Sequence, residues 1–324
     1  SSDFGFGLTQ TRAPPPPASP QRAAQPREGR RGKWAALAMR PAQRISDAER
    51  RFLLDGVAQG LRNDGRGCFD YRRIAFEMDP IPSSTGSCRL RAGETDLLVS
   101  VKCDMGRPSP RRPDAGQMHV AVDCAASVSV TFSEAWGAEE TSRQLSVLLE
   151  TLCASDDIVD RRALCVLPGS FAWEVYVDVL VLTSGGNLLD SVSLALCAAL
   201  SETILPKVEV IEAMEEGEVV QLRVDDRPEV GAAFPLRRLP LCVTVAQLGR
   251  QFLFDVTSDE ELCADAMLCV VVDAKTGEVV GLHKLGRGLF DLASLPAMLQ
   301  RCRASAAALM MQLDRELAFK GQPM

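Results

Sequence analysis

The spacing of apolar residues along the chain changes from a helical to a strand-like pattern. Ser46 and Glu49 form a capping-box motif, and apolar residues then recur at helical spacing, which predicts an amphipathic helix over 47–61. From there to about residue 132, apolar and polar residues alternate, which is typical of strands with one buried face. The expected strands lie at 74–78, 87–91, 95–103 and 118–132.

The second half of the chain mixes helical and strand-like segments. We expect a helix at 139–154, an apolar strand at 173–182 and a helix at 188–201 that ends before Pro206. The remaining strands are expected near 207–212, 218–224, 241–246, 251–256, 267–273 and 278–284, and a final helix at 294–318. Two units, each of strands followed by helices, predict an α+β or mixed α/β fold.

These patterns divide the chain into five parts. Residues 1–38 are rich in Pro, Ala, Gly and Arg without any period, which predicts a disordered basic tail. The tail is either a non-native extension or an arm that touches RNA. The other parts are an N-terminal helix at 39–61, a first domain at 62–205, a second domain at 206–318 with the C-terminal helix, and a short tail at 319–324.

Charge and cysteine content limit the classes of function. The net charge is −7 and residues 1–38 carry +4, so the remainder carries −11, which attracts phosphate chains poorly over long range. The eleven cysteines form no C-x-x-C pair and there are only two histidines, so we expect reduced thiols, no metal site and no cofactor. No apolar run reaches the ~18 residues of a membrane span.

Three motifs occur in a fixed order. The first is Leu-Arg-Asn-Asp-Gly-Arg at 61–66 with Asp-Tyr-Arg at 70–72, and the second runs from Gly86-Ser87 to Gly-Glu-Thr at 93–95. The third is Tyr-Val-Asp-Val-Leu at 176–180 with Gly-Gly-Asn-Leu-Leu-Asp at 185–190. Over about 44–315, this order and spacing resemble ribonuclease PH-like proteins, in particular the ring subunits of the eukaryotic RNA exosome.

The resemblance implies a fold, partners and a location. It implies a ribonuclease PH-like two-module fold in which sheets pack with helices. The expected partners are other ribonuclease PH-like subunits, paired as heterodimers within a hexameric ring, together with cap subunits. Single-stranded RNA would pass through the channel during RNA degradation and ribosomal RNA maturation. The expected location is the nucleus, including the nucleolus, and the cytoplasm.

The positions that match the active site of catalytic relatives are degenerate. Those relatives place phosphate-binding arginines where this chain has Glu139 and Glu140, and an acid where it has Ser184. Two carboxylates repel phosphate, and a serine cannot act as a general acid near neutral pH. Asp178 remains, either facing the old site or as a satisfied structural carboxylate. Asp190 recurs in inactive as well as active relatives, which indicates a role in packing rather than in catalysis.

Six arginines are candidates for RNA contacts. Arg107, Arg111 and Arg112 lie in the proline-rich segment 105–116, which we expect to be an exposed loop, where they either bind RNA or are simply solvated. The other three candidates lie in the first motif: Arg62, Arg66 and Arg72. Those either bind RNA or pair internally, and the expected acceptors for Arg66 and Arg72 are Asp64 and Asp70.

The sequence therefore predicts a non-catalytic structural subunit of the ring. One alternative is an active phosphate-dependent 3′–5′ exoribonuclease that shares its site with a partner subunit. A second alternative is a stand-alone binding domain of similar fold.

Overall fold

The computed structural model describes residues 45–125, 138–211, 221–225, 227–286, 288–290 and 293–320. The chain divides into two units, Ser1–Pro41 and Ala42–Met324, and all of the described residues belong to the second. The basic tail expected at 1–38 and the final residues 321–324 lie outside the described residues.

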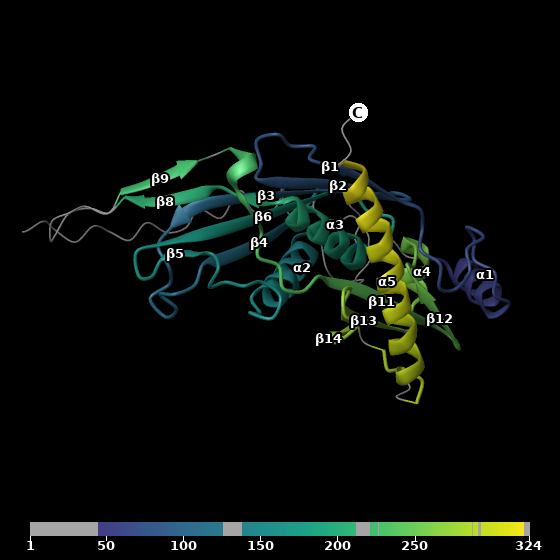
Figure 1. The fold of residues 1–324 in the computed structure, drawn as a ribbon. Helices are drawn as coiled ribbons and strands as arrows, with labels where there is room; N and C mark the ends of the chain where they lie inside the picture. The colour runs from purple at the N-terminus through teal and green to yellow at the C-terminus, as the bar shows by residue number, and fades with distance from the viewer. Residues whose placement is uncertain are drawn as a thin grey trace, which may run out of the picture. The chain divides into compact units, whose positions relative to one another are not determined.

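A mixed sheet forms the larger half of the second unit (Figure 1). Its strands run in the order β1 (Ile74–Met78), β2 (Gly86–Ala92), β3 (Thr95–Gly106), β6 (Phe171–Thr183), β4 (Gln117–Cys124), and the short β5 (Cys165–Leu167) also pairs with β6. All pairs are antiparallel except β4 with β6. Helix α2 (Ala138–Cys153) packs on β4, and helix α3 (Leu188–Glu202) packs on β2 and β3.

A smaller antiparallel sheet forms the rest of the core. Its strands follow the order β12 (Gln251–Phe254), β11 (Pro240–Leu248), β13 (Ala266–Asp273), β14 (Val279–Leu285). Helix α5 (Leu295–Lys320) packs on β11 and β13. Helices α1 (Asp47–Ala58) and α4 (Ser258–Cys263) pack together, and α4 also contacts β11. The remaining short elements are β7 (Ile204–Leu205), β8 (Lys207–Ile211), β9 (Gln221–Asp225), the 3₁₀ turn Pro228–Val230 and β10 (Ala232–Ala233).

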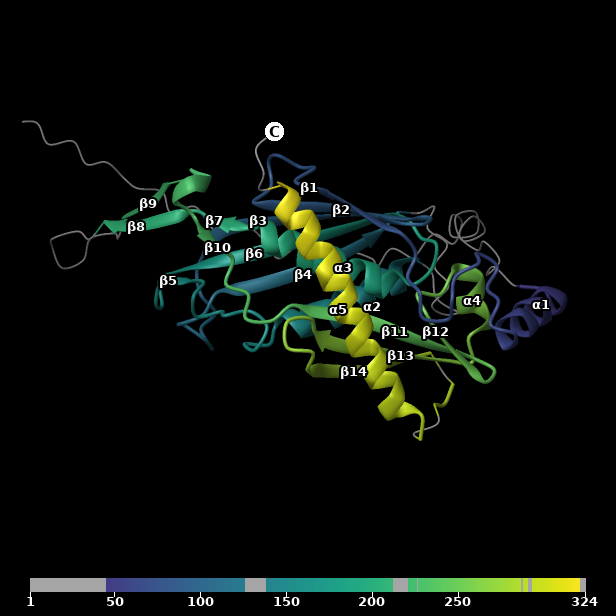
Figure 2. The same cartoon turned by 45° about the vertical axis from the view of Figure 1, so that its right-hand side comes forward.

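Helix α3 connects the two sheets. It contacts β2 and β3 of the first sheet and β11 of the second, and Figure 2 shows it in the middle of the unit. Residues 188–200 are all buried, as expected for a helix that is apolar all round. By contrast, β6 buries Val177 and Val179 but exposes Tyr176 and Leu180, so the other face of the first sheet is open to solvent in this chain.

The fold class predicted from the sequence is confirmed, with differences at the ends of elements. The capping box of α1 forms as expected, but the helix ends at Ala58 because Gly60 adopts a left-handed conformation (φ 75°). Strand β4 ends at Cys124, and 126–137 lie outside the described residues. The segment 105–116 is only partly the exposed loop that we expected, since β3 extends to Gly106 and Pro108 is buried.

A buried carboxyl group ties α3 to the second sheet. Oδ2 of Asp190 accepts hydrogen bonds from the Thr244 N–H (2.9 Å), the Tyr71 hydroxyl (2.8 Å) and Asn187 Nδ2 (3.0 Å). Oδ1 accepts from the Thr244 hydroxyl at 2.6 Å. Burial raises the pKa of Asp190 to about 6, although these hydrogen bonds act in the opposite direction. The charge of this carboxylate is therefore costly inside the protein.

Replacing Asp190 by Asn should reveal this cost as a pH dependence. A raised pKa means that the folded protein holds the proton more tightly than the unfolded chain does. The protonated Asp190 carboxyl therefore contributes its full stabilisation of the fold below about pH 4, the pKa of this group in the unfolded chain. This contribution is lost as the pH rises through about 6, its pKa in the folded protein. A difference of about two pKa units corresponds to about 3 kcal/mol. In urea titrations between pH 4 and 7, the wild type should lose that much stability relative to Asp190→Asn. A difference that stays constant with pH would contradict the raised pKa.

Candidate functional site

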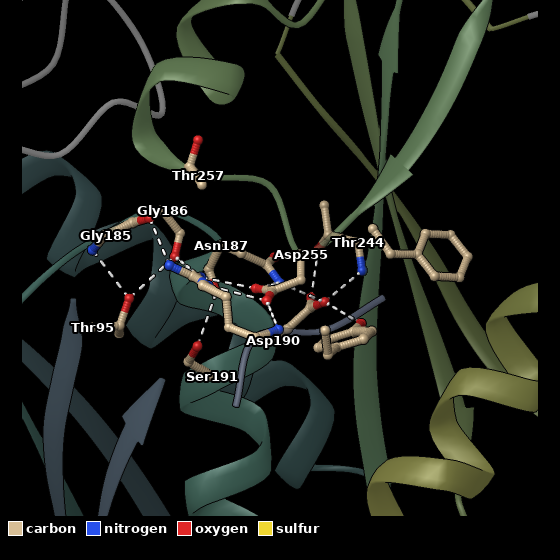
Figure 3. Close-up of polar contacts among 12 residues, drawn as sticks. Thr95, Gly185, Gly186, Asn187, Asp190, Ser191, Thr244, Asp255 and Thr257 are labelled. Carbon is tan, nitrogen blue, oxygen red and sulfur yellow. Dashed lines mark hydrogen bonds and ion pairs between the residues drawn. The ribbon is translucent and has the colours of Figure 1, made fainter. Parts of the chain in front are cut away.

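The carboxylate of Asp255 collects five hydrogen bonds from other parts of the chain. Oδ2 accepts from Arg66 Nη1 (3.0 Å), from the Arg72 backbone N–H (2.6 Å) and from Arg72 Nε (3.0 Å). Oδ1 accepts from Arg72 Nη2 (2.8 Å) and Asn187 Nδ2 (3.0 Å). Asp255 follows β12 directly and has a φ of 45°, which few non-glycine residues adopt. Figure 3 shows it beside Asn187 and Asp190.

The surroundings of Asp255 keep it ionised. Burial raises the pKa of this carboxyl, but the hydrogen bonds and the charge of Arg72, with the Asn187 amide, lower it by more. The net effect is a pKa below the usual value. Asp255 and Asp190 both accept from the Asn187 amide, but only Asp255 contacts guanidinium groups among the described residues. The pKa values of the two neighbouring acids are therefore shifted in opposite directions.

Arg72 also fixes the turn between β6 and α3. Its Nη1 donates to the Gly185 carbonyl at 2.7 Å and its Nη2 to the Gly186 carbonyl at 2.9 Å. Gly186 has a φ of 91°, and a Cβ atom there would lie 2.5 Å from the Thr257 carbonyl carbon. Only glycine fits this close approach between the turn and the segment before α4.

The N–H groups of this turn already have protein acceptors. The Gly185 N–H donates to the Thr95 hydroxyl at 3.0 Å, and the Asn187 N–H donates to Oε1 of Glu261 at 2.6 Å. The start of a helix after glycines can bind an anion through free N–H groups. Here the carboxylate of Glu261 takes that place, so the turn does not provide a phosphate cradle at these two positions.

Arg62 is enclosed completely. Its Nε and Nη2 donate to the Glu260 carboxylate at 2.9 and 2.6 Å. The remaining donors reach the carbonyls of Phe254, Asp255 and Gly67. The side chain has no exposed surface, and its five N–H donors are matched by five acceptors. This geometry gives Arg62 a structural role and leaves it no donor for an RNA phosphate.

Arg66 and Arg72 also pair internally, partly with other acceptors than the sequence suggested. Arg66 does bind Asp64, at 2.7 Å from Nε. The Asp70 carboxylate instead accepts from the Gly67 N–H at 2.9 Å, and Asp255 is the shared acceptor of both arginines. Sequence reasoning missed Asp255. A usable signal was its place directly after a strand and before Thr257 and Glu260, which form the capping box of α4.

The loop arginines lie in a different environment. Arg107 and Arg111 are exposed and form no ion pair within the described part of the chain, whereas Arg112 pairs with Asp156. The loop packs beside a second segment, where the Gly116 N–H donates to the Arg161 carbonyl at 2.8 Å. That segment adds Arg161 and an exposed Arg162 to the loop arginines, and Arg162 lies 3.4 Å from Asp114.

The positions that the sequence predicts to be degenerate active-site positions lie at or directly after β6 and at the start of α2. Asp178 is exposed on the open face of the first sheet, opposite Ser100 and Ala121 on the neighbouring strands, so it is not a buried structural carboxylate. Ser184 is half-buried, directly after β6. Glu139 is exposed in the first turn of α2, and the side chain of Glu140 lies outside the described residues.

Neither a metal centre nor a membrane span is found among the residues that the structure describes. They contain no group of three or more His, Cys, Asp or Glu side chains that could hold a metal ion. None of their helices is long and apolar enough to cross a membrane.

Replacing Arg62 by Ala should destabilise the protein strongly. The change leaves the buried Glu260 carboxylate without its partner, which typically costs about 3–5 kcal/mol. The matched control is Arg107→Ala on the exposed loop, which should change the free energy of unfolding by at most about 0.5 kcal/mol. Guanidinium chloride titrations of both variants provide the measurement. Equal, small effects would show that Arg62 is not structural.

Comparisons with known proteins identify two domains in order along the chain. Residues 70–206 match the model of domain 1 of the 3′ exoribonuclease family, and residues 238–301 match that of domain 2. The chain is similar to exosome complex component Rrp42 of Thermococcus gammatolerans, with 34% identity over 74% of this chain and 84% of the relative. Its similarity to exosome complex component Rrp42 of Sulfurisphaera tokodaii is 30% over 82% of this chain and 93% of the relative.

A solved structure extends the comparison to three dimensions. It is described as the Archaeoglobus fulgidus exosome with RNA bound to the active site, and the matching chain superposes with a TM-score of 0.69 at 29% identity. The match covers 82% of this chain and 98% of that chain. With both domain models matched in order along the chain, and relatives above 30% identity over most of its length, this protein belongs to the 3′ exoribonuclease (ribonuclease PH) family.

Proposed function

We propose that this chain is a non-catalytic, structural subunit of an exosome ring. In this role it supports 3′–5′ processing and degradation of RNA, including maturation of ribosomal RNA, by the assembly. The support is its similarity to Rrp42 components along most of the chain, together with a superposition on a chain of a solved exosome. Its partners would be other ribonuclease PH-like subunits and cap subunits, in the nucleus, the nucleolus and the cytoplasm.

The observation that carries the lack of catalysis is Ser184 directly after β6, at the position where active relatives place an acid. A serine hydroxyl neither binds a metal ion as a carboxylate does nor supplies a proton near neutral pH. Glu139 supports the same conclusion, since it matches a position where catalytic relatives have a phosphate-binding arginine, and its carboxylate would repel phosphate. In addition, the Glu261 carboxylate accepts a hydrogen bond from the Asn187 N–H at the start of α3, so this N–H is not available to a phosphate.

The specific observation in favour of the alternative is Asp178. It is exposed on the outer side of β6 and forms no ion pair with described residues, so a partner subunit could approach it. An active phosphate-dependent exoribonuclease would then need its phosphate cradle from that partner. The alternative is weaker because it requires both a borrowed cradle and a replacement for the acid at Ser184.

The purified chain should release no nucleoside diphosphates from the 3′ end of RNA when phosphate is supplied. In a reconstituted ring, Asp178→Asn should leave any phosphate-dependent release unchanged, because this chain has Ser184 where catalytic relatives place an acid. The matched control is Asp123→Asn, on the adjacent strand and on the same open face. Release by the isolated chain, or a loss of release in the ring with Asp178→Asn but not with Asp123→Asn, would favour the alternative.

RNA binding by the assembled ring should depend on the two unpaired loop arginines. Each lost phosphate contact lowers the slope of log affinity against log salt by roughly 0.7 for single strands, so Arg107→Ala with Arg111→Ala should lower it by roughly 1.4. The control is Arg112→Ala, which should change the slope less because Asp156 already holds that guanidinium. Filter binding of single-stranded RNA at several salt concentrations provides the slopes. Equal slopes for the wild-type and doubly substituted rings would show that the loop is only solvated.

A further inference from the structure

Strands β8 and β9 form a ribbon of their own. They pair only with each other among the described strands, with Val208 opposite Val224 and Val210 opposite Leu222. Residues directly opposite each other in an antiparallel pair lie on the same side, and neighbours along a strand lie on opposite sides. One side of the ribbon, here called the valine side, therefore carries four aliphatic residues: Val208, Val210, Leu222 and Val224.

The valine side is only partly covered by the rest of the chain. Val208 packs partly against the main core, but Val210 is 37% exposed and Val224 is 43% exposed. In both views the ribbon lies at the end of the first sheet that is farthest from α1 and α4 (Figures 1 and 2). An isolated two-stranded ribbon is at best marginally stable in water. A covering surface would remove this aliphatic side from water.

The charges of the ribbon exclude a charged partner for this side. Lys207 and Glu209 pair with each other at 3.0 Å, and Asp225 pairs with Arg227 at 2.6 Å. The charged residues within the two strands lie on the side opposite the valines, because they alternate with them along the strands: Lys207, Glu209, Arg223 and Asp225. A surface without charge neither attracts RNA phosphates nor favours an acidic or basic protein surface. What fits it is an apolar protein surface.

The area of the valine side limits what can cover it. Four aliphatic side chains bury on the order of a few hundred Å², whereas a stable interface needs about 1,200 Å² or more. The ribbon can therefore only extend an interface formed elsewhere, which disfavours a dimer held by two ribbons.

We propose that the valine side docks on an uncharged, apolar surface of a neighbouring, different protein subunit, as an extension of their main interface. This inference rests on the proposed function, because it requires a multi-subunit assembly. RNA and a second copy of this chain are the other occupants that an experiment must separate.

The test uses the full chain assembled with its partner subunits. Val210→Lys combined with Val224→Lys should weaken the binding of one neighbouring subunit at least tenfold, which corresponds to about 1.4 kcal/mol. The matched control is Ile211→Lys. Ile211 is 50% exposed and follows Val210 directly, but it lies on the opposite side of the ribbon, so its replacement should leave the assembly intact. Native mass spectrometry over a dilution series measures the loss of each subunit, and thermal melting of the isolated chain checks that each variant is folded.

Each outcome decides between the occupants. Loss of a subunit with the double variant alone supports the proposal, whereas an intact assembly with both variants overturns it. Equal loss with both variants would show that the ribbon is held by its edges rather than by the valine side. A dimer of the isolated chain that only the double variant abolishes would identify a second copy as the occupant, and reduced cross-linking to RNA without loss of a subunit would identify RNA. A wild-type chain that joins no assembly would contradict the proposed function itself, and this inference with it.

Discussion

The buried carboxylate of Asp255 is the interaction on which the arrangement of the two sheets depends. It accepts hydrogen bonds from Arg66, Arg72 and Asn187, which come from the segment before β1 and from the start of α3. These donors belong to two of the motifs that stand out in the sequence, while Asp255 directly follows β12 of the second sheet. A buried ion pair is costly to break from one side, because the remaining charge stays in a poorly polarisable environment. Replacing Arg66, Arg72 or Asn187 would therefore destabilise the fold, whether or not the protein has any catalytic activity.

This network explains how the fold can accept substitutions at the positions that match the active site of catalytic relatives. Gly186 lies so close to Thr257 that a Cβ atom would collide with backbone atoms, and Arg72 binds the carbonyls of the same turn. Ser184 precedes this turn and is only half-buried, and no hydrogen bond of the network runs through its side chain. An acid can thus be replaced by serine at that position without disturbing the connection between the sheets. The position that matches a catalytic acid, Ser184, is thus next to the residues that hold the sheets together but is not one of them.

Local patterns in the sequence were sufficient for most elements but not for the network. The strands around Val177 and the uniformly apolar α3 follow directly from the spacing of their apolar residues. Helix α4 has six residues, fewer than two turns, so it shows no helical period that could be read. Asp64 and Asp70 were the expected acceptors because they are close in sequence, but Asp255 lies more than 180 residues from Arg72. Its position depends on a left-handed backbone conformation and on the packing of two sheets, neither of which leaves a periodic signal.

The distribution of arginines also limits how RNA can be held. The chain beyond residue 38 carries a net charge of −11, so its overall field opposes a polyanion. Of the six arginines considered from sequence, three are committed to internal carboxylates and carbonyls, and Arg112 is paired with Asp156. Arg107 and Arg111 are the two that remain without an ion pair in the described part of the chain. Two phosphate contacts supply only a small part of the affinity that proteins with six to ten contacts achieve. If RNA is held near this chain, most of the positive charge must therefore come from outside these six arginines.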